Sequence, residues 1–564
     1  YDRRHLKGDL AAGVAVTALI VPKNLGYAGI AGVPVQNGLY AAAAGALIYA
    51  LFGTSRQIST GPSSSLAAVA GGAVLAIGLT GNQAAQLVAA ITLVTGILFL
   101  LLAVFRLGRI AQFLSKAVVT GFLAGAAVDV VIGELPKLTG TSAKGDNAWR
   151  ELSTWIGGLD KVHWTTVLVG LVALGVILGL RVIAPRIPGA LVLVVGGLAA
   201  TPLFGLGTHG VALVGEVPRG LPTPALPSIH LVETHLSTIF AAAVALLLIG
   251  FSQTAGDART FATRHRYRVD IDQETVAQGM ANLGAGTFQG IPVSTSLSAS
   301  SLNESAGART PLASLITGVL VLLTLIALAP LFSKLPKAVL AAIIIDAVVF
   351  GMIDIPELRR LYRVKRFDFV IAVLAFVGVL SAGVLAGVVI GVALSLGWLI
   401  YVATAPAMPL LGRERGTETF RESDENPSDE TFPGVAVLRL DGGLFFATAD
   451  ALHDRLRAVT QDGDVPVHGV VLDLEGVDFI DSQGAAKLAE IGELGESAGI
   501  AVRLARVKAA VITVLDAEGV VDQIGADHVH GEVYEAVQAQ LAADAADGVP
   551  VSQLAKSSAS GEER

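Results

Sequence analysis

Cysteine is absent from this chain of 564 residues, and charged residues make up only 15% of it. The lack of thiols excludes disulfides, thiol catalysis and metal sites with thiolate ligands. The sequence also lacks a phosphate-binding P-loop, a cluster of metal ligands and a serine–histidine–aspartate set, so nothing in it indicates an enzyme, a cofactor or a bound metal. No basic patch stands out and the formal net charge is −8, which argues against nucleic-acid binding.

Hydrophobic residues are abundant instead. They form 53% of the chain, which also holds 64 glycines and has a mean hydropathy of +0.66. Apolar runs of about 20 residues recur, as helices that span a lipid bilayer require. The predicted spans are residues 10–32, 38–52, 63–79, 85–105, 117–133, 165–182, 188–203, 238–251, 313–331, 338–351 and, as a pair, 367–403. With two amphiphilic stretches, 273–287 and 296–305, the sequence predicts a polytopic membrane protein of about 14 elements, which divide as seven plus seven.

Two short polar runs interrupt this apolar sequence: Gly-Pro-Ser-Ser-Ser at 61–65 and Ile-Pro-Val-Ser-Thr-Ser-Leu-Ser at 291–298. A helix that begins part-way through a bilayer is tolerated only where its end lines a cavity. Such a start carries the positive end of the helix dipole and is suited to an anion. Because the runs lie in opposite halves, they favour an inverted-repeat secondary transporter with one anion site between them. The site residues expected from the two runs are Ser63, Ser64, Ser65, Ser296, Leu297, Ser298 and Ala299.

Each serine taken singly has a structural alternative. Serine and threonine in membrane helices often bond back to the preceding turn or join neighbouring helices, and small residues alone allow close packing. The clustering of these residues just after Pro62 and Pro292 favours the anion site.

Basic residues fall in alternate loops, and the positive-inside rule then places both termini on the cytoplasmic side of the cytoplasmic membrane. The loop from 138 to 163 is also basic and fits the rule less well. The run from residue 10 is too long for a cleavable signal peptide, so none is expected. The residues that carry the rule are Arg3, Arg4, Lys7, Arg106, Arg109, Lys116, Arg181, Arg186, Arg264, Arg266, Arg268, Arg359, Arg360, Arg363, Lys365 and Arg366, and the exceptions are Lys144, Arg150 and Lys161.

The character of the chain changes after the predicted membrane domain, residues 1–405. Residues 406–431 are charged, lack apolar periodicity and are interpreted as a linker. Residues 432–543 alternate strand-like and helical patterns, which predicts an α/β domain of ordinary size. The polar tail, 544–564, is expected to be disordered.

Several motifs in the membrane part resemble the signature of the SulP anion transporters, the family of animal anion exchangers and plant sulfate transporters. These motifs are Gly-Asp-Leu-Ala-Ala-Gly at 8–13, Val-Pro-Lys-Asn-Leu-Gly-Tyr-Ala at 21–28, Ala-Gly-Val-Pro at 31–34 and Leu-Phe-Gly-Thr-Ser-Arg-Gln-Ile-Ser-Thr-Gly-Pro at 51–62, with further matches at 259–262, 267–270, 282–284 and 309–313. The segment Leu-Asp-Leu-Glu-Gly-Val-Asp-Phe-Ile-Asp-Ser-Gln-Gly at 472–484 resembles the core of a STAS domain, which most of these transporters carry.

The resemblance covers nearly the whole chain in the right order. It implies a fold of about 14 helices in two inverted repeats, divided into a core and a gate, and it implies a homodimer. It also implies a secondary transporter that moves a small anion (sulfate, bicarbonate or a small dicarboxylate) by alternating access. An uncoupled anion channel or uniporter on the same fold is the alternative, and a membrane-tethered STAS signalling protein with vestigial transport is a more remote one.

Departures from the family pattern bear on mechanism. The family commonly has glutamine where this chain has Lys23, and many members have arginine where it has Ala299. A lysine inside the membrane costs roughly 2.5 to 3.5 kcal/mol, so Lys23 is expected to face a cavity or a carboxylate, with snorkelling to an interface as the alternative. We expect Lys23, Tyr27 and Gln253 on the wall of the anion cavity.

Proton-coupled relatives resemble one another in an acidic residue that aligns with Gln253, whereas this chain has Asp257 one helical turn later. Desolvation favours the neutral form of a carboxyl group and a nearby ammonium favours the charged form. A direct or water-mediated pair of Lys23 and Asp257 is therefore a candidate for sodium-independent proton coupling. The alternative is that Asp257 pairs with Arg259 at the membrane surface. Three further acidic residues in or near spans stay unassigned: Asp129, Glu134 and Asp346.

In the STAS-like segment, Ser482 aligns with the serine that is phosphorylated in bacterial anti-sigma antagonists. A phosphate there would place negative charge at a helix N-terminus and could act as a regulatory switch. The alternative is that Asp481 and Ser482 serve as a helix N-cap.

Overall fold

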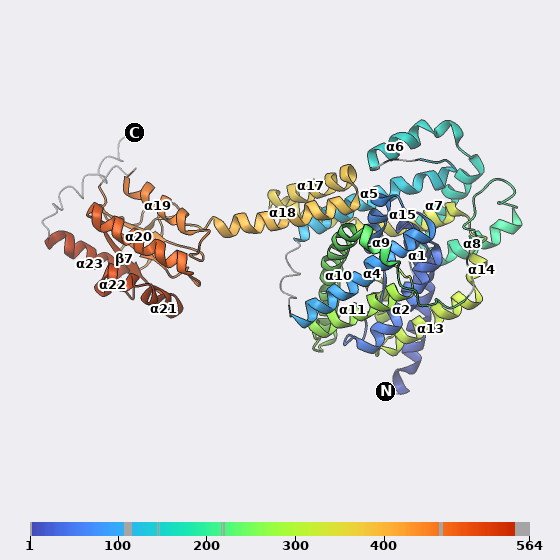
Figure 1. Ribbon diagram of the computed structural model, residues 1–564, viewed down its shortest axis with the longest axis horizontal. Helices are drawn as coiled ribbons and strands as arrows, with labels where there is room; N and C mark the ends of the chain where they lie inside the picture. The colour runs from blue at the N-terminus through green and yellow to red at the C-terminus, as the bar shows by residue number, and fades with distance from the viewer. Residues whose placement is uncertain are drawn as a thin grey trace. The chain divides into compact units, whose positions relative to one another are not determined.

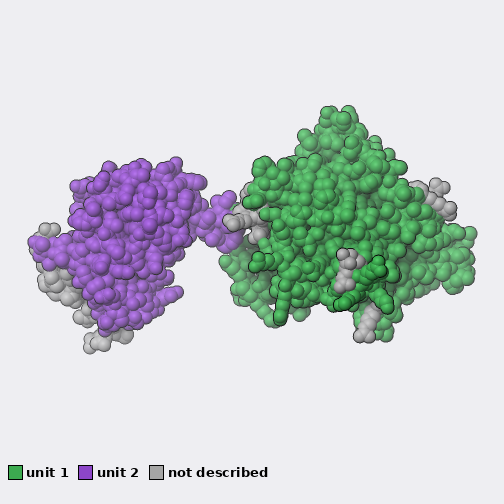
Figure 2. All heavy atoms as spheres, turned by 90° about the horizontal axis from the view of Figure 1, so that it is seen from below, with its two compact units in different colours: residues 1–396 green, residues 397–564 purple. Residues whose placement is uncertain are grey.

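The fold is described from a computed structural model of the chain. The structure describes residues 3–106, 115–143, 145, 147–185, 187–215, 217, 220–461 and 466–546. Arg109, Lys144, Arg186 and the predicted tail beyond residue 546 lie outside the described residues. The chain forms two compact units, residues 1–396 and 397–564, which Figure 2 shows in different colours; Figure 1 shows the helices and strands of each.

Unit 1 is built of helices that follow the predicted spans, and within the described residues they form two series of seven. The first series is α1 (Leu6–Ile30), α2 (Val35–Phe52), α3 (Ser64–Ile77), α4 (Gly81–Val104), α5 (Lys116–Thr139), α7 (Trp164–Ile183) and α8 (Gly189–Leu203). The second is α10 (Leu236–His265), α11 (Ile271–Thr287), α12 (Leu297–Ser305), α13 (Leu312–Ala327), α15 (Lys337–Met352), α17 (Arg366–Ala382) and α18 (Val384–Thr404).

Short elements join these helices: the turns η1 (Arg3–His5) and η3 (Leu159–Lys161), and the helices α6 (Ala148–Gly157), α9 (Ile229–Thr234), α14 (Ala329–Phe332) and α16 (Ile355–Val364). The predicted pair at 367–403 divides at Gly383, whose φ of 86° is readily adopted only by glycine. The predicted span at 238–251 is only the middle of α10, which continues through a polar stretch to His265. Among the described residues, seven helices are long and apolar enough to cross a membrane.

The helices pack as two bundles, each of which draws on both series. In one, α2 packs against α11 and α13, α4 against α10 and α11, and α1 against α13. In the other, α5 packs against α15 and α17, and α7 packs against α15. Small residues allow the close approaches, as at Gly96 of α4, which meets the backbone of Gly279 and Leu283 on α11. The first bundle corresponds to a core and the second to a gate, and Figure 1 shows α1 and α2 beside α13 and α17 beside α18.

Two short strands lie in the core bundle, directly before its two half-length helices. Strand β1 (Thr60–Pro62) precedes α3 and β2 (Val293–Thr295) precedes α12, and they pair antiparallel with Thr60 opposite Thr295. The buried Asn282 amide donates to the carbonyl of Val293 (2.8 Å) and accepts from its N–H (3.0 Å). The non-helical backbone is thereby satisfied inside the protein, as apolar surroundings demand.

Unit 2 is an α/β domain with its own buried core. Four parallel strands form a sheet in the order β5–β6–β7–β8. Helices connect successive strands, as the alternating pattern predicts. The strands are β5 (Val435–Arg439), β6 (Gly469–Asp473), β7 (Ala501–Ala505) and β8 (Val529–His530). Between them lie α19 (Ala449–Gln461), α20 (Ser482–Ala498), α21 (Ala509–Ala517), α22 (Val520–Ile524) and η4 (Ala526–His528), and α23 (Val533–Ala546) follows β8.

The segment predicted as a linker, 406–431, differs from that expectation. It contains an antiparallel hairpin of β3 (Leu411–Arg413) and β4 (Phe420–Glu422). Phe420 and Leu411 are buried in the core of unit 2, and Arg421 pairs with Asp429 at 2.6 Å. The charged residues that predict a solvated linker pair with one another instead. The strands of this hairpin are also too short to show a pattern of apolar residues.

Candidate anion-binding site

The two half-length helices of the core begin beside the paired strands. Ser63 is the N-cap of α3 and its hydroxyl accepts from the N–H of Leu66 (3.4 Å); Ser296 is the N-cap of α12 and accepts from the N–H of Ala299 (3.4 Å). The other N–H groups of each first turn have no partner within the helix. Both polar runs are therefore helix starts, each with the positive end of a helix dipole at the strand pair.

A small cavity of about 20 Å³ lies between these strands and α1. Lys23 and Tyr27 of α1 line it together with Ser296, Ser298 and Ala299, and the stretch 59–62 completes the wall. A volume of this size holds little more than one water-sized group. An anion of several atoms can enter only if the helices around the cavity move apart.

The start of α3 is joined to α10 by a chain of hydrogen bonds. The amide Nε2 of Gln253 donates to the hydroxyl of Ser65 (3.0 Å), which lies 3.1 Å from the hydroxyl of Ser63. The Oε1 atom of Gln253 is buried and has no hydrogen-bond partner in the described structure. Ser63, Ser64, Ser65, Gln253 and Leu297 do not line the small cavity, so the structure gathers the predicted site residues in two neighbouring sets.

Asp257 is held by the strand pair. The hydroxyl of Thr295 donates to Asp257 Oδ2 at 2.8 Å. Among the described residues, neither Lys23 nor Arg259 forms an ion pair with Asp257. The direct Lys23–Asp257 contact that the sequence predicts is absent, because the carboxylate is turned toward strand β2, and the pair stays a prediction only in its water-mediated form.

The acidic residue near Lys23 is Asp346 of α15, which sequence reasoning left unassigned. Asp346 acts electrostatically on both Lys23 and Tyr27. Its buried carboxylate binds Arg181 of α7 through contacts of 2.7, 2.7 and 3.0 Å, and the guanidinium lies 4.0 Å from the centre of the Phe350 ring. The sequence signal for this pair is the intramembrane acid itself, since the sequence alone places Arg181 among the loop cations.

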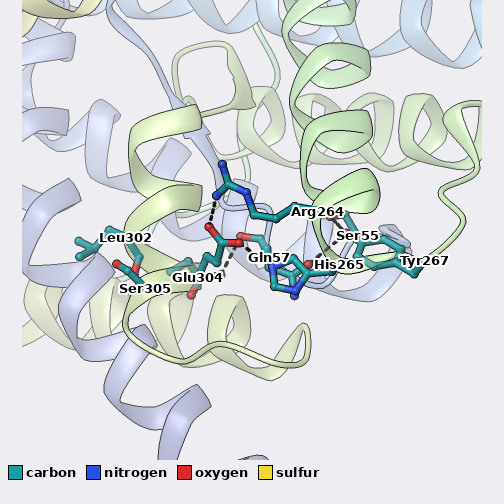
Figure 3. Close-up of polar contacts among 9 residues, drawn as sticks. Ser55, Gln57, Arg264, His265, Tyr267, Leu302, Glu304 and Ser305 are labelled. Atoms are coloured by element: carbon teal, nitrogen blue, oxygen red, sulfur yellow. Dashed lines mark hydrogen bonds and ion pairs between the residues drawn. The ribbon is translucent and has the colours of Figure 1, made fainter.

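The loop before β1 is fixed to the core by polar contacts. The buried Glu274 carboxylate accepts from the Tyr49 hydroxyl and from Thr54 and Ser55 at 2.5 to 2.9 Å. Figure 3 shows the neighbouring contacts, in which the Tyr267 hydroxyl meets Ser55 and Gln57. These contacts keep the start of α3 in place relative to α11.

The end of α12 is fixed in a similar way. Glu304 lies between Arg264 and His265 of α10, at 2.6 Å from each, as Figure 3 shows. The Asn303 amide donates to the carbonyl of Gln57 at 3.0 Å. Both half-length helices are thus anchored to the same bundle, which lets them move as one body.

In unit 2, Ser482 is the first residue of α20 and is exposed. The N-cap is Asp481 alone, whose carboxylate accepts from the N–H of Gly484 at 2.8 Å. Ser482 is therefore accessible and does not itself cap the helix. Among the described residues there is no group of three or more histidine, aspartate or glutamate side chains suited to a metal ion.

Comparison with known proteins shows what this arrangement resembles. The model of the sulfate permease family matches residues 6–375, and that of the STAS domain matches residues 426–539. A probable sulfate transporter of Mycobacterium tuberculosis is 34% identical over 541 residues, which cover 96% of each chain. The chloroplastic sulfate transporter 4.1 of Arabidopsis thaliana is 29% identical over 95% of this chain and 80% of its own.

Two solved structures share the fold. The murine anion transporter Slc26a9 has a TM-score of 0.87 at 22% identity, over 96% of this chain and 92% of its own. The transmembrane domain of the cyanobacterial bicarbonate transporter BicA has a TM-score of 0.59 at 23% identity, over 70% of this chain and 99% of its own. The predicted fold class, a helical membrane transporter with a C-terminal STAS domain, is confirmed. By the family match over residues 6–375 and the long alignments with its relatives, the chain belongs to the sulfate permease family.

Proposed function

We propose that the protein is a secondary active transporter that carries a small anion across the cytoplasmic membrane, with both termini on the cytoplasmic side. The observation that carries the proposal is the cavity in which the Lys23 ammonium meets the start of α12 and the strand pair. A cation and the positive end of a helix dipole on one cavity attract an anion. The relatives named above suggest sulfate or bicarbonate as the anion, and a small dicarboxylate is the remaining option from the sequence.

Transport proceeds by alternating access in this proposal. The two helix starts belong to the core bundle, and the gate bundle meets that core through α15, which packs against α1. Because the cavity is too small for the anion, the core has to move against the gate before the anion can enter. Gly26 and Gly29 of α1 lie against Ile344 of α15, and these small residues leave a smooth surface for that movement.

Proton coupling is assigned to Asp257. Its carboxyl group accepts a hydrogen bond from the hydroxyl of Thr295, and Thr295 pairs with Thr60 across the two strands. Protonation would weaken that charge-assisted bond and release the strand pair that carries both helix starts. Lys23 would join the same linkage through water. The coupling free energy expected for such a linkage is about 1 to 3 kcal/mol.

The experiment is anion flux into proteoliposomes with and without an inward proton gradient, in sodium-free buffer. We expect saturable uptake that the gradient accelerates. Asp257→Asn keeps an acceptor oxygen for Thr295 but cannot titrate, so it should retain exchange and lose the acceleration. Asp257→Glu is the matched control and should keep it. Acceleration that survives Asp257→Asn, or a strict sodium requirement, would refute the coupling, and flux that ignores the gradient altogether would favour an uncoupled channel.

The C-terminal domain has a regulatory and assembly role in the same proposal. Ser482 is exposed at the start of α20, where a phosphate would be stabilised by the helix dipole. The working form is a homodimer. Ser482→Asp should change the transport rate of the full-length protein while Ser482→Ala leaves it unchanged, and equal rates for both would exclude a switch at this serine.

A further inference from the structure

A second cavity lies at the end of α1 that is farther from the N-terminus. Its volume is about 300 Å³, against about 20 Å³ for the small cavity beside Lys23. The end of α1 and the start of α2 form one wall, and α5 and α15 form the other. Three of its lining residues carry charge: Glu134, Lys137 and Lys337. We call it the lysine cavity.

The charges of the lysine cavity favour an anion. Lys337 is exposed and, among the described residues, forms no ion pair, so its ammonium is available to a ligand. Lys137 binds Glu134 Oε1 at 2.6 Å and is 40% exposed. The three side chains sum to one positive charge, and α2 and α15 both begin at this cavity, which adds the positive ends of two helix dipoles.

Glu134 adds a negatively charged acceptor to the lysine cavity, which attraction of an anion alone does not require. Its side chain is almost fully buried, and its second oxygen, Oε2, has no hydrogen-bond partner in the described structure. A buried acceptor without a donor is destabilising. Sulfate at neutral pH offers only acceptors, so it would be repelled by this oxygen. An oxyanion that carries a hydroxyl group can bind the two ammonium groups and donate its O–H to Oε2 at the same time.

From these contacts we propose that the lysine cavity is an anion-binding site that selects small oxyanions bearing a hydroxyl group, of which bicarbonate is the simplest, over sulfate. Lys137 and Lys337 supply the attraction and Glu134 supplies the selection. The proposal deepens the proposed transport function and rests on it for the direction of travel.

The lysine cavity and the small cavity are both lined by residues of α1. Tyr27 lines the small cavity, and Gly29, two residues further along α1, lines the lysine cavity. On α15, Ile344 lines the lysine cavity and lies two residues before Asp346.

The test compares initial rates of bicarbonate and sulfate uptake by the full-length protein in proteoliposomes, at a fixed mildly alkaline pH and constant ionic strength. Lys337→Gln should raise KM for bicarbonate about fivefold or more and leave kcat unchanged, since Lys337 does not line the small cavity. Lys334→Gln is the matched control, because this exposed lysine lies three residues earlier, in the turn before α15, and does not line the cavity. Its KM should equal that of the wild type.

Glu134→Gln tests the selection. The amide can place an N–H where Oε2 was, so the ratio of kcat/KM for bicarbonate to that for sulfate should fall about tenfold. An unchanged ratio in a variant that elutes as the wild type does in size-exclusion chromatography would overturn the assignment of Glu134. An unchanged KM in Lys337→Gln would overturn the site itself.

A separate measurement distinguishes this inference from the proposed function. If the wild type carries neither of these anions nor a small dicarboxylate, the proposed function fails. Calorimetric titration of the purified protein with sodium bicarbonate still tests whether the lysine cavity binds an anion. Binding that weakens in Lys337→Gln and persists in Lys334→Gln supports the site. Absence of binding, or an affinity unchanged in Lys337→Gln, overturns it.

Discussion

Arg181 and Asp346 form an ion pair, and replacing one partner should change anion affinity in the opposite direction from replacing the other. The Asp346 carboxylate is held by three contacts of 2.7 to 3.0 Å and acts electrostatically on Lys23. Arg181→Met leaves that carboxylate unneutralised, so it should draw on Lys23 and weaken anion binding. Asp346→Leu removes the competing charge and should strengthen it.

The size of the effect follows from the burial of the two partners. Removing one partner of a fully buried ion pair costs about 3 to 5 kcal/mol. The Asp346 side chain is 9% exposed but that of Arg181 is 43% exposed, so screening reduces the cost. We expect about 2 kcal/mol of destabilisation for Arg181→Met, less for Asp346→Leu, and a coupling free energy between the positions of about 1 to 3 kcal/mol. The accompanying change in anion affinity should be about 1 kcal/mol, which is severalfold in Kd.

The assay is a double-mutant cycle on the purified full-length protein. In thermal unfolding in detergent, Arg181→Met should be less stable than Asp346→Leu. The loss of stability in the double variant should be smaller than the sum of the losses in the two single variants. Equilibrium sulfate binding should weaken in Arg181→Met and tighten in Asp346→Leu. The reasoning is refuted if the two single substitutions shift the affinity in the same direction, or if their effects on unfolding simply add.

Other predictions concern the anchoring of the core and the soluble unit. Glu274→Gln should reduce the free energy of unfolding of the membrane unit by about 2 to 4 kcal/mol and so lower its unfolding temperature, because the carboxylate accepts charge-assisted hydrogen bonds from several donors. An unchanged melting curve would show that these hydrogen bonds are dispensable. Ending the chain after Thr404 should leave the membrane fold intact and reduce transport or dimerisation, and full activity with an unchanged dimer in light scattering would contradict this. Burial and the Arg503 guanidinium lower the pKa of His530 in the folded state. The free energy of unfolding of unit 2 should therefore be highest above about pH 6.5 and decrease below it, because the unfolded chain then binds the proton more readily. Urea unfolding across that range should show the decrease in the wild type and a flatter profile in His530→Gln, and identical profiles would exclude His530 as the cause.

The helix starts could be predicted from the sequence because their signals are local. A proline followed by serines inside an apolar half marks a helix that begins within the membrane, and Ser63 and Ser296 are indeed N-caps. The antiparallel pairing of Thr60 with Thr295 could not be predicted, since it joins positions more than two hundred residues apart and the strands are too short to show a pattern.

Charge partners were the other limit of sequence reasoning. A charge inside the membrane requires a partner or a cavity; in the structure Asp346 pairs with Arg181 and Lys23 lines the small cavity, although the sequence left Asp346 without a role. Which charges meet depends on helix packing, however, and Arg181 stood at the end of its helix among apparent loop cations. The predicted pair of Lys23 and Asp257, direct or through water, followed from the departures from the family pattern and from the cost of charges inside the membrane, and the orientation of Asp257 toward Thr295 is a tertiary feature.

The central claim is that Lys23 and the two helix starts bind the transported anion. Equilibrium binding of labelled sulfate and bicarbonate to purified wild type, Lys23→Gln and Tyr27→Phe tests it most directly. The account predicts that Lys23→Gln raises Kd about tenfold or more for the bound anion, because Lys23 supplies the one ammonium among the described residues that line the cavity, while Tyr27→Phe, which keeps the ring, changes it severalfold less. Equal and small changes in the two variants would place the anion elsewhere and contradict the account.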